Sequence, residues 1–129
     1  MKTRGIKNHK MNDAVYKQRR QVIDCIYKLK SALRAEGLKL PRIEVRIGVQ
    51  TKGYENFLAW GKMTKCETWY SEDALAHKNL MGIVAHEIGH AWLGLEHDEN
   101  CPLMCKYAND MTTDINKMTA VLREGTKNN

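Results

Sequence analysis

The sequence lacks the features of a membrane protein and of a secreted one. None of its apolar runs approaches the ~20 residues that a membrane-spanning helix needs. Its amino-terminal segment is basic but is not followed by an apolar stretch, so we expect no secretory signal peptide. Internal repeats and low-complexity segments are also absent. These absences favour a cytoplasmic protein that does not bind membranes.

Cysteine is scarce, with Cys25, Cys66, Cys101 and Cys105 in 129 residues. In a cytoplasmic protein these residues are expected to be free thiols. A chain of this length can bury one hydrophobic core without disulfide bonds, which predicts a single domain. Cys101 and Cys105 follow closely on the histidine motif described below. A second zinc site or a redox-active bond between them is therefore an alternative interpretation.

Acidic residues are nearly absent from the first twenty positions. This segment contains seven Lys and Arg residues but a single acid, Asp13, whereas the remaining 109 residues carry 14 charges of each sign. A basic arm of this kind can contact nucleic-acid phosphates non-specifically, and a solvated tail is the alternative. Because residues 1–11 show no periodicity, we predict a flexible basic arm there and one folded domain over 12–129.

A helical pattern follows this arm. Between Asn12, a suitable N-cap, and Gly37, apolar residues recur at steps of three and four. Leu40-Pro41 confirms the break after the helix. The predicted buried stripe consists of Val15, Val22, Ile26, Leu29 and Leu33, and Tyr16 and Ile23 widen it.

Three short strands are predicted after the first helix. Residues 42–50 alternate between apolar and polar side chains, which is typical of a half-buried strand, and a turn is expected at 51–53. Residues 57–64 and 66–71 form weaker patterns, because Gly61 and several lysines interrupt them. Strands adjacent in sequence with short connections are expected to be antiparallel neighbours.

Two further helices complete the prediction. One spans 76–93, after a short turn capped by Ser71 or Asp73, and the last spans 110–122. The expected fold is α+β, with a short mixed or antiparallel sheet packed on the amino-terminal helix. The helix over 76–93 carries the site, and a carboxy-terminal helix closes the domain.

The helix over 76–93 contains the motif His86-Glu87-Ile88-Gly89-His90. Histidines four residues apart lie about 40° and about 6 Å from each other on one helix face. Both rings can therefore reach one zinc ion at about 2.0–2.1 Å. Glu87 can hold a metal-bound water without being a ligand. The histidines lie away from Ile88 on the apolar stripe, so we expect them to face a cleft.

A third ligand is needed, and His97 is the first candidate. On a continuing helix His97 would lie about 16 Å along the axis from His86, so the chain must fold back. Gly94 is placed to end the helix in the left-handed conformation. We predict one Zn²⁺ bound by His97 and the two motif histidines, with Asp98 and Asp110 as alternative third ligands.

This stretch resembles the zincin metallopeptidases, in particular the metzincins, with their H-E-x-x-H-x-x-G-x-x-H pattern and Met-turn. Three residues rather than two separate the second histidine from the glycine, and one added residue rotates the helix exit by about 100°. SprT-like peptidases, also zincins, have a longer and more variable interval, and residues 61–75 followed by HEIGHAW are similar to them, although their His-Gly pair is absent. The matching residues are His86, Glu87, His90, Gly94 and His97, with Met104 at the Met-turn.

The resemblance covers roughly residues 43–107 and implies a small zincin-like domain with peptidase activity on a protein or peptide substrate. Zinc would lower the pKa of its water and polarise the scissile carbonyl, with Glu87 as general base. The substrate would lie beside an edge strand, for which residues 57–64 are the candidate. Met104 would form an apolar floor beneath the metal. Tyr107 is a candidate for stabilising the oxyanion.

Two other classes of function stay open. A zinc-dependent endoribonuclease family active in ribosomal RNA maturation uses three histidines at related spacing, but it has Gly after the first histidine, so Glu87 argues against it. A catalytically inactive, zinc-stabilised nucleic-acid-binding module is supported only by the additional residue before Gly94. A SprT-like enzyme would combine both themes by cleaving proteins attached to DNA.

Overall fold

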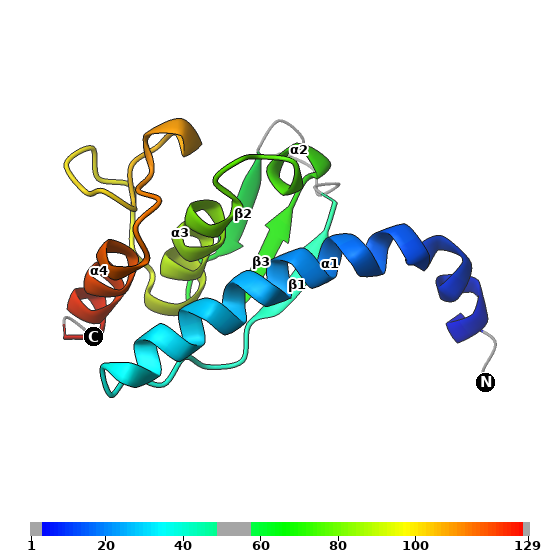
Figure 1. The fold of residues 1–129 in the computed structure, drawn as a ribbon, viewed down its shortest axis with the longest axis horizontal. Helices are drawn as coiled ribbons and strands as arrows, with labels where there is room; N and C mark the ends of the chain where they lie inside the picture. The colour runs from blue at the N-terminus through cyan, green and yellow to red at the C-terminus, as the bar shows by residue number, and fades with distance from the viewer. Residues whose placement is uncertain (1–3, 49–57, 128–129) are drawn as a thin grey trace.

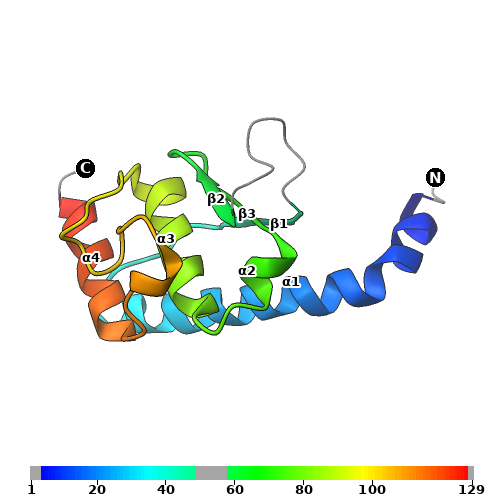
Figure 2. The ribbon, with the colours of Figure 1, turned by 90° about the horizontal axis from the view of Figure 1, so that it is seen from above.

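A long amino-terminal helix underlies the rest of the fold (Figure 1). The computed structural model describes residues 4–48 and 58–127, with side chains described from residue 14 onward. The helix, α1, spans Arg4–Ala35 and buries Val22, Leu29 and Leu33 completely. Its amino-terminal part projects beyond the sheet and the other helices (Figures 1 and 2). The predicted buried stripe is confirmed at these three buried residues, and Val15, Ile23 and Ile26 are half-buried. The prediction is wrong for Tyr16, which is 51% exposed.

The two ends of α1 differ in how well the sequence predicts them. The helix begins at Arg4 rather than Asn12, so the expected lack of regular structure is wrong for residues 4–11. Lys and Arg are good helix formers, so a basic segment without hydrophobic periodicity can still be helical. The flexibility of this segment stays a prediction. The predicted end is confirmed, because the helix ends at Ala35 and Gly37, two residues later, is left-handed with φ 80°.

Three strands form a mixed sheet in the order β1-β3-β2. Strand β1 (Glu44–Ile47) pairs in parallel with β3 (Glu67–Tyr70), and β2 (Ala59–Lys62) pairs antiparallel with β3. The expected antiparallel pairing of sequence neighbours is right for β2 and β3 but wrong for β1 and β2, which do not touch in the sheet. Strand β2 is consequently an edge strand. The parts of the predicted strands and turn within 49–57 lie outside the described residues.

Two helices follow β3. Helix α2 (Glu72–Leu75) is the predicted short turn, and Ser71 caps it by accepting a 3.1 Å hydrogen bond from the Ala74 N–H. Helix α3 (Leu80–Leu93) begins later than predicted, because the buried Asn79 side chain caps it through the Gly82 N–H. Packing on α1, α4 and the sheet surrounds α3 with apolar side chains.

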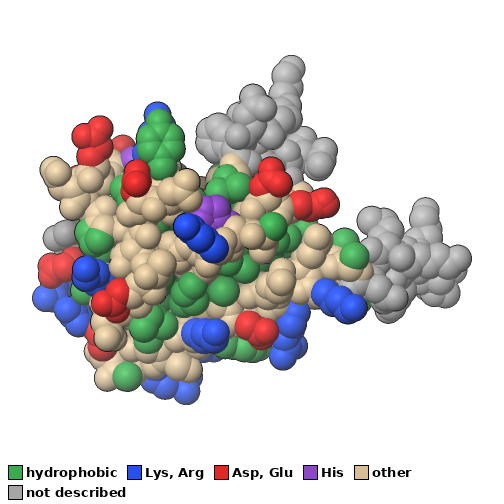
Figure 3. Space-filling view, turned by 45° about the horizontal axis from the view of Figure 1, so that its top comes forward, with side chains coloured by type: hydrophobic (Ala, Val, Ile, Leu, Met, Phe, Trp, Pro, Cys, Tyr) green, Lys and Arg blue, Asp and Glu red, His purple; other side chains and the backbone are tan. Residues whose placement is uncertain are grey.

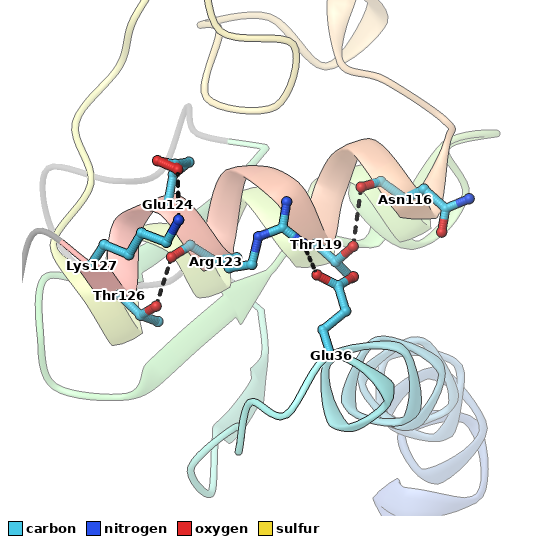
Figure 4. A network of polar contacts seen from close by, with 7 residues as sticks. All are labelled: Glu36, Asn116, Thr119, Arg123, Glu124, Thr126 and Lys127. Carbon is cyan, nitrogen blue, oxygen red and sulfur yellow. Dashed lines mark hydrogen bonds and ion pairs between the residues drawn. The ribbon is translucent and has the colours of Figure 1, made fainter.

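The last helix, α4 (Ile115–Lys127), also begins later than predicted, because residues 108–110 form a separate 3₁₀ turn, η1. Its buried side contains Met118 and Leu122. Figure 4 shows Arg123 of α4 in an ion pair with Glu36, just after α1. Within the described ranges, no helix is long and apolar enough to cross a membrane. The predicted α+β class is confirmed.

Candidate metal centre

Helix α3 presents the two motif histidines on one side. Their rings meet edge to face with centroids 4.7 Å apart, and the two Nε2 atoms are 3.1 Å apart. His86 is 2% exposed, whereas His90 is half-buried at the floor of a cleft. The predicted one-face arrangement is confirmed, and it places His86 deeper than the cleft-facing position that the helical pattern indicates.

The end of α3 brings a third histidine to the pair. Gly94 is left-handed with φ 67°, as predicted, and the following Leu95 N–H reaches the Gly89 carbonyl, six residues back, at 3.1 Å. A regular helix would pair that amide with the carbonyl four residues back, so the last turn is widened. The widened turn accommodates the additional residue of the motif. The chain then folds back and brings His97 Nε2 to 3.3 Å from His90 Nε2.

The hairpin between β2 and β3 covers the carboxy-terminal end of α3. The Thr64 N–H donates to the His90 carbonyl at 3.1 Å, and the Cys66 N–H donates to the Ala91 carbonyl at 2.8 Å. Thr64 and Cys66 both have positive φ, 58° and 55°, which turns their amides towards the helix. The bond to Ala91 satisfies a carbonyl that a helix end otherwise leaves unpaired, whereas the His90 carbonyl also accepts from the Gly94 N–H at 3.1 Å. The two hairpin bonds also hold the edge strand beside the histidines.

A loop after His97 closes the other side of the site. The Asp98 N–H donates to the Met104 carbonyl at 2.9 Å, which shapes residues 98–104 into a closed turn. Within this loop, the Leu103 carbonyl lies 2.8 Å from His86 Nδ1. The same loop therefore positions His97 and holds the ring of His86. Neither contact follows from the sequence pattern.

Backbone carbonyls decide which nitrogen of each motif histidine is free. Leu103 O lies 2.8 Å from His86 Nδ1, and Leu95 O lies 2.6 Å from His90 Nδ1. A carbonyl oxygen only accepts, so each Nδ1 carries the hydrogen, and the neutral ring then presents a lone pair at Nε2. Two lone pairs 3.1 Å apart repel each other rather than form a hydrogen bond. A cation between the two nitrogens removes this repulsion.

The three histidines fit a single metal ion. One nitrogen from each lies within 4.8 Å of the others. Zinc bonds of about 2.0–2.1 Å in tetrahedral geometry separate ligand nitrogens by about 3.3–3.4 Å, close to the 3.1 and 3.3 Å found here. The Nδ1 contacts with carbonyls are the outer contacts that orient metal-binding histidines. The structure thus brings the predicted residues together, whereas the alternatives Asp98 and Asp110 lie outside this group.

Glu87 is buried beside this group. Its side chain is 5% exposed, and Oε1 has no hydrogen-bond partner in the described part of the chain. Burial raises the pKa of the Glu87 carboxyl to about 8, and a hydrogen bond from the Gly61 backbone opposes that rise. A buried carboxyl oxygen without a hydrogen-bond partner is unfavourable in a folded protein, and a strongly shifted pKa in a cleft is typical of functional sites.

A cleft of about 740 Å³ opens over Glu87 and the histidines. Strand β2, helix α3 and residues 106–111 line it, and Figure 3 shows histidine side chains (purple) at the surface beside hydrophobic and basic ones. Tyr107 is 63% exposed at this cleft, with Lys106 Nζ 5.6 Å from its ring centroid. The apolar lining away from the histidines consists of Leu58, Ala59, Ile83, Ala108 and Met111.

Met104 and the cysteines have structural positions. Met104 is 2% exposed, and its Sδ lies 2.8 Å from the point where a Cβ on Gly89 would be, directly against the motif helix. All four cysteines are free thiols, as predicted. Neither Cys101 nor Cys105 belongs to a cluster of three or more potential ligands among the described side chains. The structure gives the alternative of a second zinc site or redox bond no support.

Gly61 contributes to the geometry of the site, which the sequence pattern does not predict. A Cβ at this position would lie 2.3 Å from the Glu87 carbonyl oxygen and 3.1 Å from His90 Cβ, so only glycine lets β2 approach α3 this closely. In the sequence pattern, Gly61 only interrupts a weakly predicted strand. A glycine inside a strand is itself a signal of close backbone approach.

Comparison with known proteins finds no relative: no family model, no curated protein and no solved structure matches this chain. The resemblance to zincins therefore depends on the motif residues and their geometry.

Gly61→Ala should destabilise the fold and disturb the site together, because the new methyl group meets backbone rather than a flexible side chain. We expect a loss of about 1–3 kcal/mol in the free energy of unfolding, measured in urea, with weaker zinc binding. Gly37→Ala is the control: φ is positive there but no atom lies within 4 Å, so stability should fall with zinc affinity unchanged. Equal zinc affinities in wild type and Gly61→Ala would contradict the assigned role.

The chelator-treated protein should lose stability between pH 6.5 and 8. Glu87 has a folded pKa of about 8, above its ordinary 4.5, so the folded state keeps a proton that the unfolded state releases. Burial lowers the pKa of His86 from 6.5 to about 4. Between these values the unfolded state binds the extra proton, so stability rises with pH there, but this rise ends near pH 6.5. We expect a fall of about 2 kcal/mol, measured by urea unfolding. The free energy of unfolding of Glu87→Gln should fall less over the same pH range, by that amount. An equal fall in both proteins would refute the assignment.

Proposed function

We propose that this chain is a zinc-dependent metallopeptidase with Glu87 as general base. The observation that carries the proposal is the convergence of three imidazole Nε2 atoms in one open cleft, beside a buried carboxyl whose Oε1 has no hydrogen-bond partner. Three histidine nitrogens leave the fourth position of a tetrahedral ion free, which is typical of catalytic rather than structural zinc. The ligands are His86, His90 and His97. When bound, zinc supplies a Lewis acid that polarises a carbonyl and lowers the pKa of water.

Glu87 performs the proton transfer. Its Oε1 is unpaired and its side chain lines the cleft, so it can take a proton from water and pass it to the leaving nitrogen. A divalent cation nearby favours the ionised carboxylate, which opposes the effect of burial. The carboxyl then has the protonation state that a general base needs. The Gly61 backbone hydrogen bond acts in the same direction.

The shape of the cleft favours a peptide over a nucleic acid as the substrate. Strand β2 is an edge of the sheet, and an extended peptide can add to such an edge through main-chain hydrogen bonds. The lining also includes Ala108 and Met111, which suit an apolar substrate side chain, although Lys62 and Lys106 line the same cleft. We infer from this that the endoribonuclease alternative is the weaker one.

Purified protein should contain about one zinc per chain, and His90→Ala and His97→Ala should each strongly reduce it, because each removes one of three converging nitrogens. Metal analysis by mass spectrometry measures this. His77→Ala is the matched control: its Nε2 lies 3.1 Å from Asn109 Oδ1, outside the group, so zinc content should not change. Full zinc in His90→Ala would refute the site.

Glu87→Gln should keep zinc but lose hydrolysis of casein-type substrates by about 10²–10⁴-fold, since an amide cannot accept the proton. Glu99→Gln, at an exposed position outside the cleft lining, should remain active. Full activity in Glu87→Gln would refute the catalytic role. If the wild type cleaves single-stranded RNA and no protein, the endoribonuclease function replaces ours. Zinc binding without hydrolysis of either would indicate an inactive binding module.

A further inference from the structure

Helix α1 carries nearly all of the net positive charge of this protein. Its 32 residues contain nine Lys and Arg residues and two acids, whereas residues 36–129 contain 11 basic and 13 acidic residues. The chain as a whole has a net charge of +6. A single long helix is therefore the basic surface of the molecule, and its partner is expected to be anionic.

One side of α1 combines this charge with exposed aromatic rings. Tyr16 is 51% exposed and Tyr27 is 56% exposed, while Arg20 and Arg34 are also exposed. At about 100° per residue, the two tyrosines lie within about 20° of each other and the arginines within about 40° of them. These four residues form one stripe, about 27 Å long, which we call the Tyr–Arg stripe.

The Tyr–Arg stripe faces away from the core. In Figure 2 the rest of the fold lies mainly on one side of α1, where Val22, Leu29 and Leu33 are buried. Arg20 forms a 3.2 Å ion pair with Asp24, but both side chains are more than half exposed, and such pairs are weak. The stripe therefore has two exposed aromatic rings and two exposed arginines on one side of the helix, with Tyr27 the more exposed ring.

We propose that the Tyr–Arg stripe binds single-stranded nucleic acid. Exposed aromatic rings stack on unpaired bases, and arginines between them contact the phosphates of the same strand. In a duplex the base faces are stacked and out of reach of the rings, so the single strand is the favoured form. An acidic protein surface would use the arginines alone. This proposal does not depend on the metal centre or on peptidase activity.

The test is fluorescence anisotropy of labelled 20-nucleotide single strands of DNA and RNA, with the zinc-loaded full chain near 150 mM salt. Tyr27→Ala should weaken binding by roughly 5- to 100-fold, and Tyr27→Phe should retain it, because stacking uses the ring. Arg20→Gln combined with Arg34→Gln should lower the slope of log K against log salt by about 1.4. The control, Lys65→Gln with Lys117→Gln, removes the same charge from exposed positions outside α1 and should change the slope little.

Three results would overturn the proposal. The first is no binding of either single strand at micromolar protein. The second is equal weakening by the Tyr–Arg stripe variants and the Lys65/Lys117 control, which would assign binding to overall charge. The third is tight binding of polyglutamate that Tyr27→Ala does not affect, which would indicate an acidic protein partner. Zinc content and casein hydrolysis, measured alongside, should be the same in all of these variants.

Discussion

The carboxy-terminal end of α3 is the constraint on which the site depends. The helix must stop within one turn of His90, and its last carbonyls must still find donors, because an unpaired buried carbonyl is unfavourable. Gly94 provides the left-handed exit, and the hairpin amides of Thr64 and Cys66 provide the donors. One set of hydrogen bonds therefore ends the helix, aims His97 back towards the pair and fixes the edge strand above the cleft.

The electrostatics of the site indicate that the histidine cluster has a function. Carbonyl contacts at Nδ1 direct the Nε2 lone pairs of His86 and His90 at each other, and burial disfavours a proton on either ring. Glu87 is buried next to them without a partner for Oε1. Folding alone gains nothing from converging lone pairs or from an unpaired carboxyl. A cation bound between the rings relieves both, which is why we interpret the cluster as functional.

The two candidate surfaces, the cleft and the Tyr–Arg stripe, lie on different parts of the molecule. The cleft over the histidines has a largely apolar lining and lies along the edge strand β2, whereas the Tyr–Arg stripe lies on helix α1. Apolar walls and strand edges suit peptides, and exposed rings with guanidinium groups suit unpaired bases and phosphates. An enzyme with both surfaces would act on proteins near nucleic acid. The resemblance to SprT-like peptidases implies the same combination.

Local chemistry let the sequence by itself determine the α+β class, the one-face pairing of His86 and His90 and the glycine exit at Gly94. Each follows from periodicity or from the conformational freedom of a single residue. Only the tertiary structure decided the parallel pairing of β1 with β3, the start of α1 at Arg4, the close approach at Gly61 and the carbonyl partner of His86. Pairing across a sheet and contacts between distant loops depend on three-dimensional packing, which leaves no periodic trace in the chain. His97 depends on both the sequence and the tertiary structure. Its residue type indicates it as a ligand, and the widened turn of α3 brings it to the other two histidines.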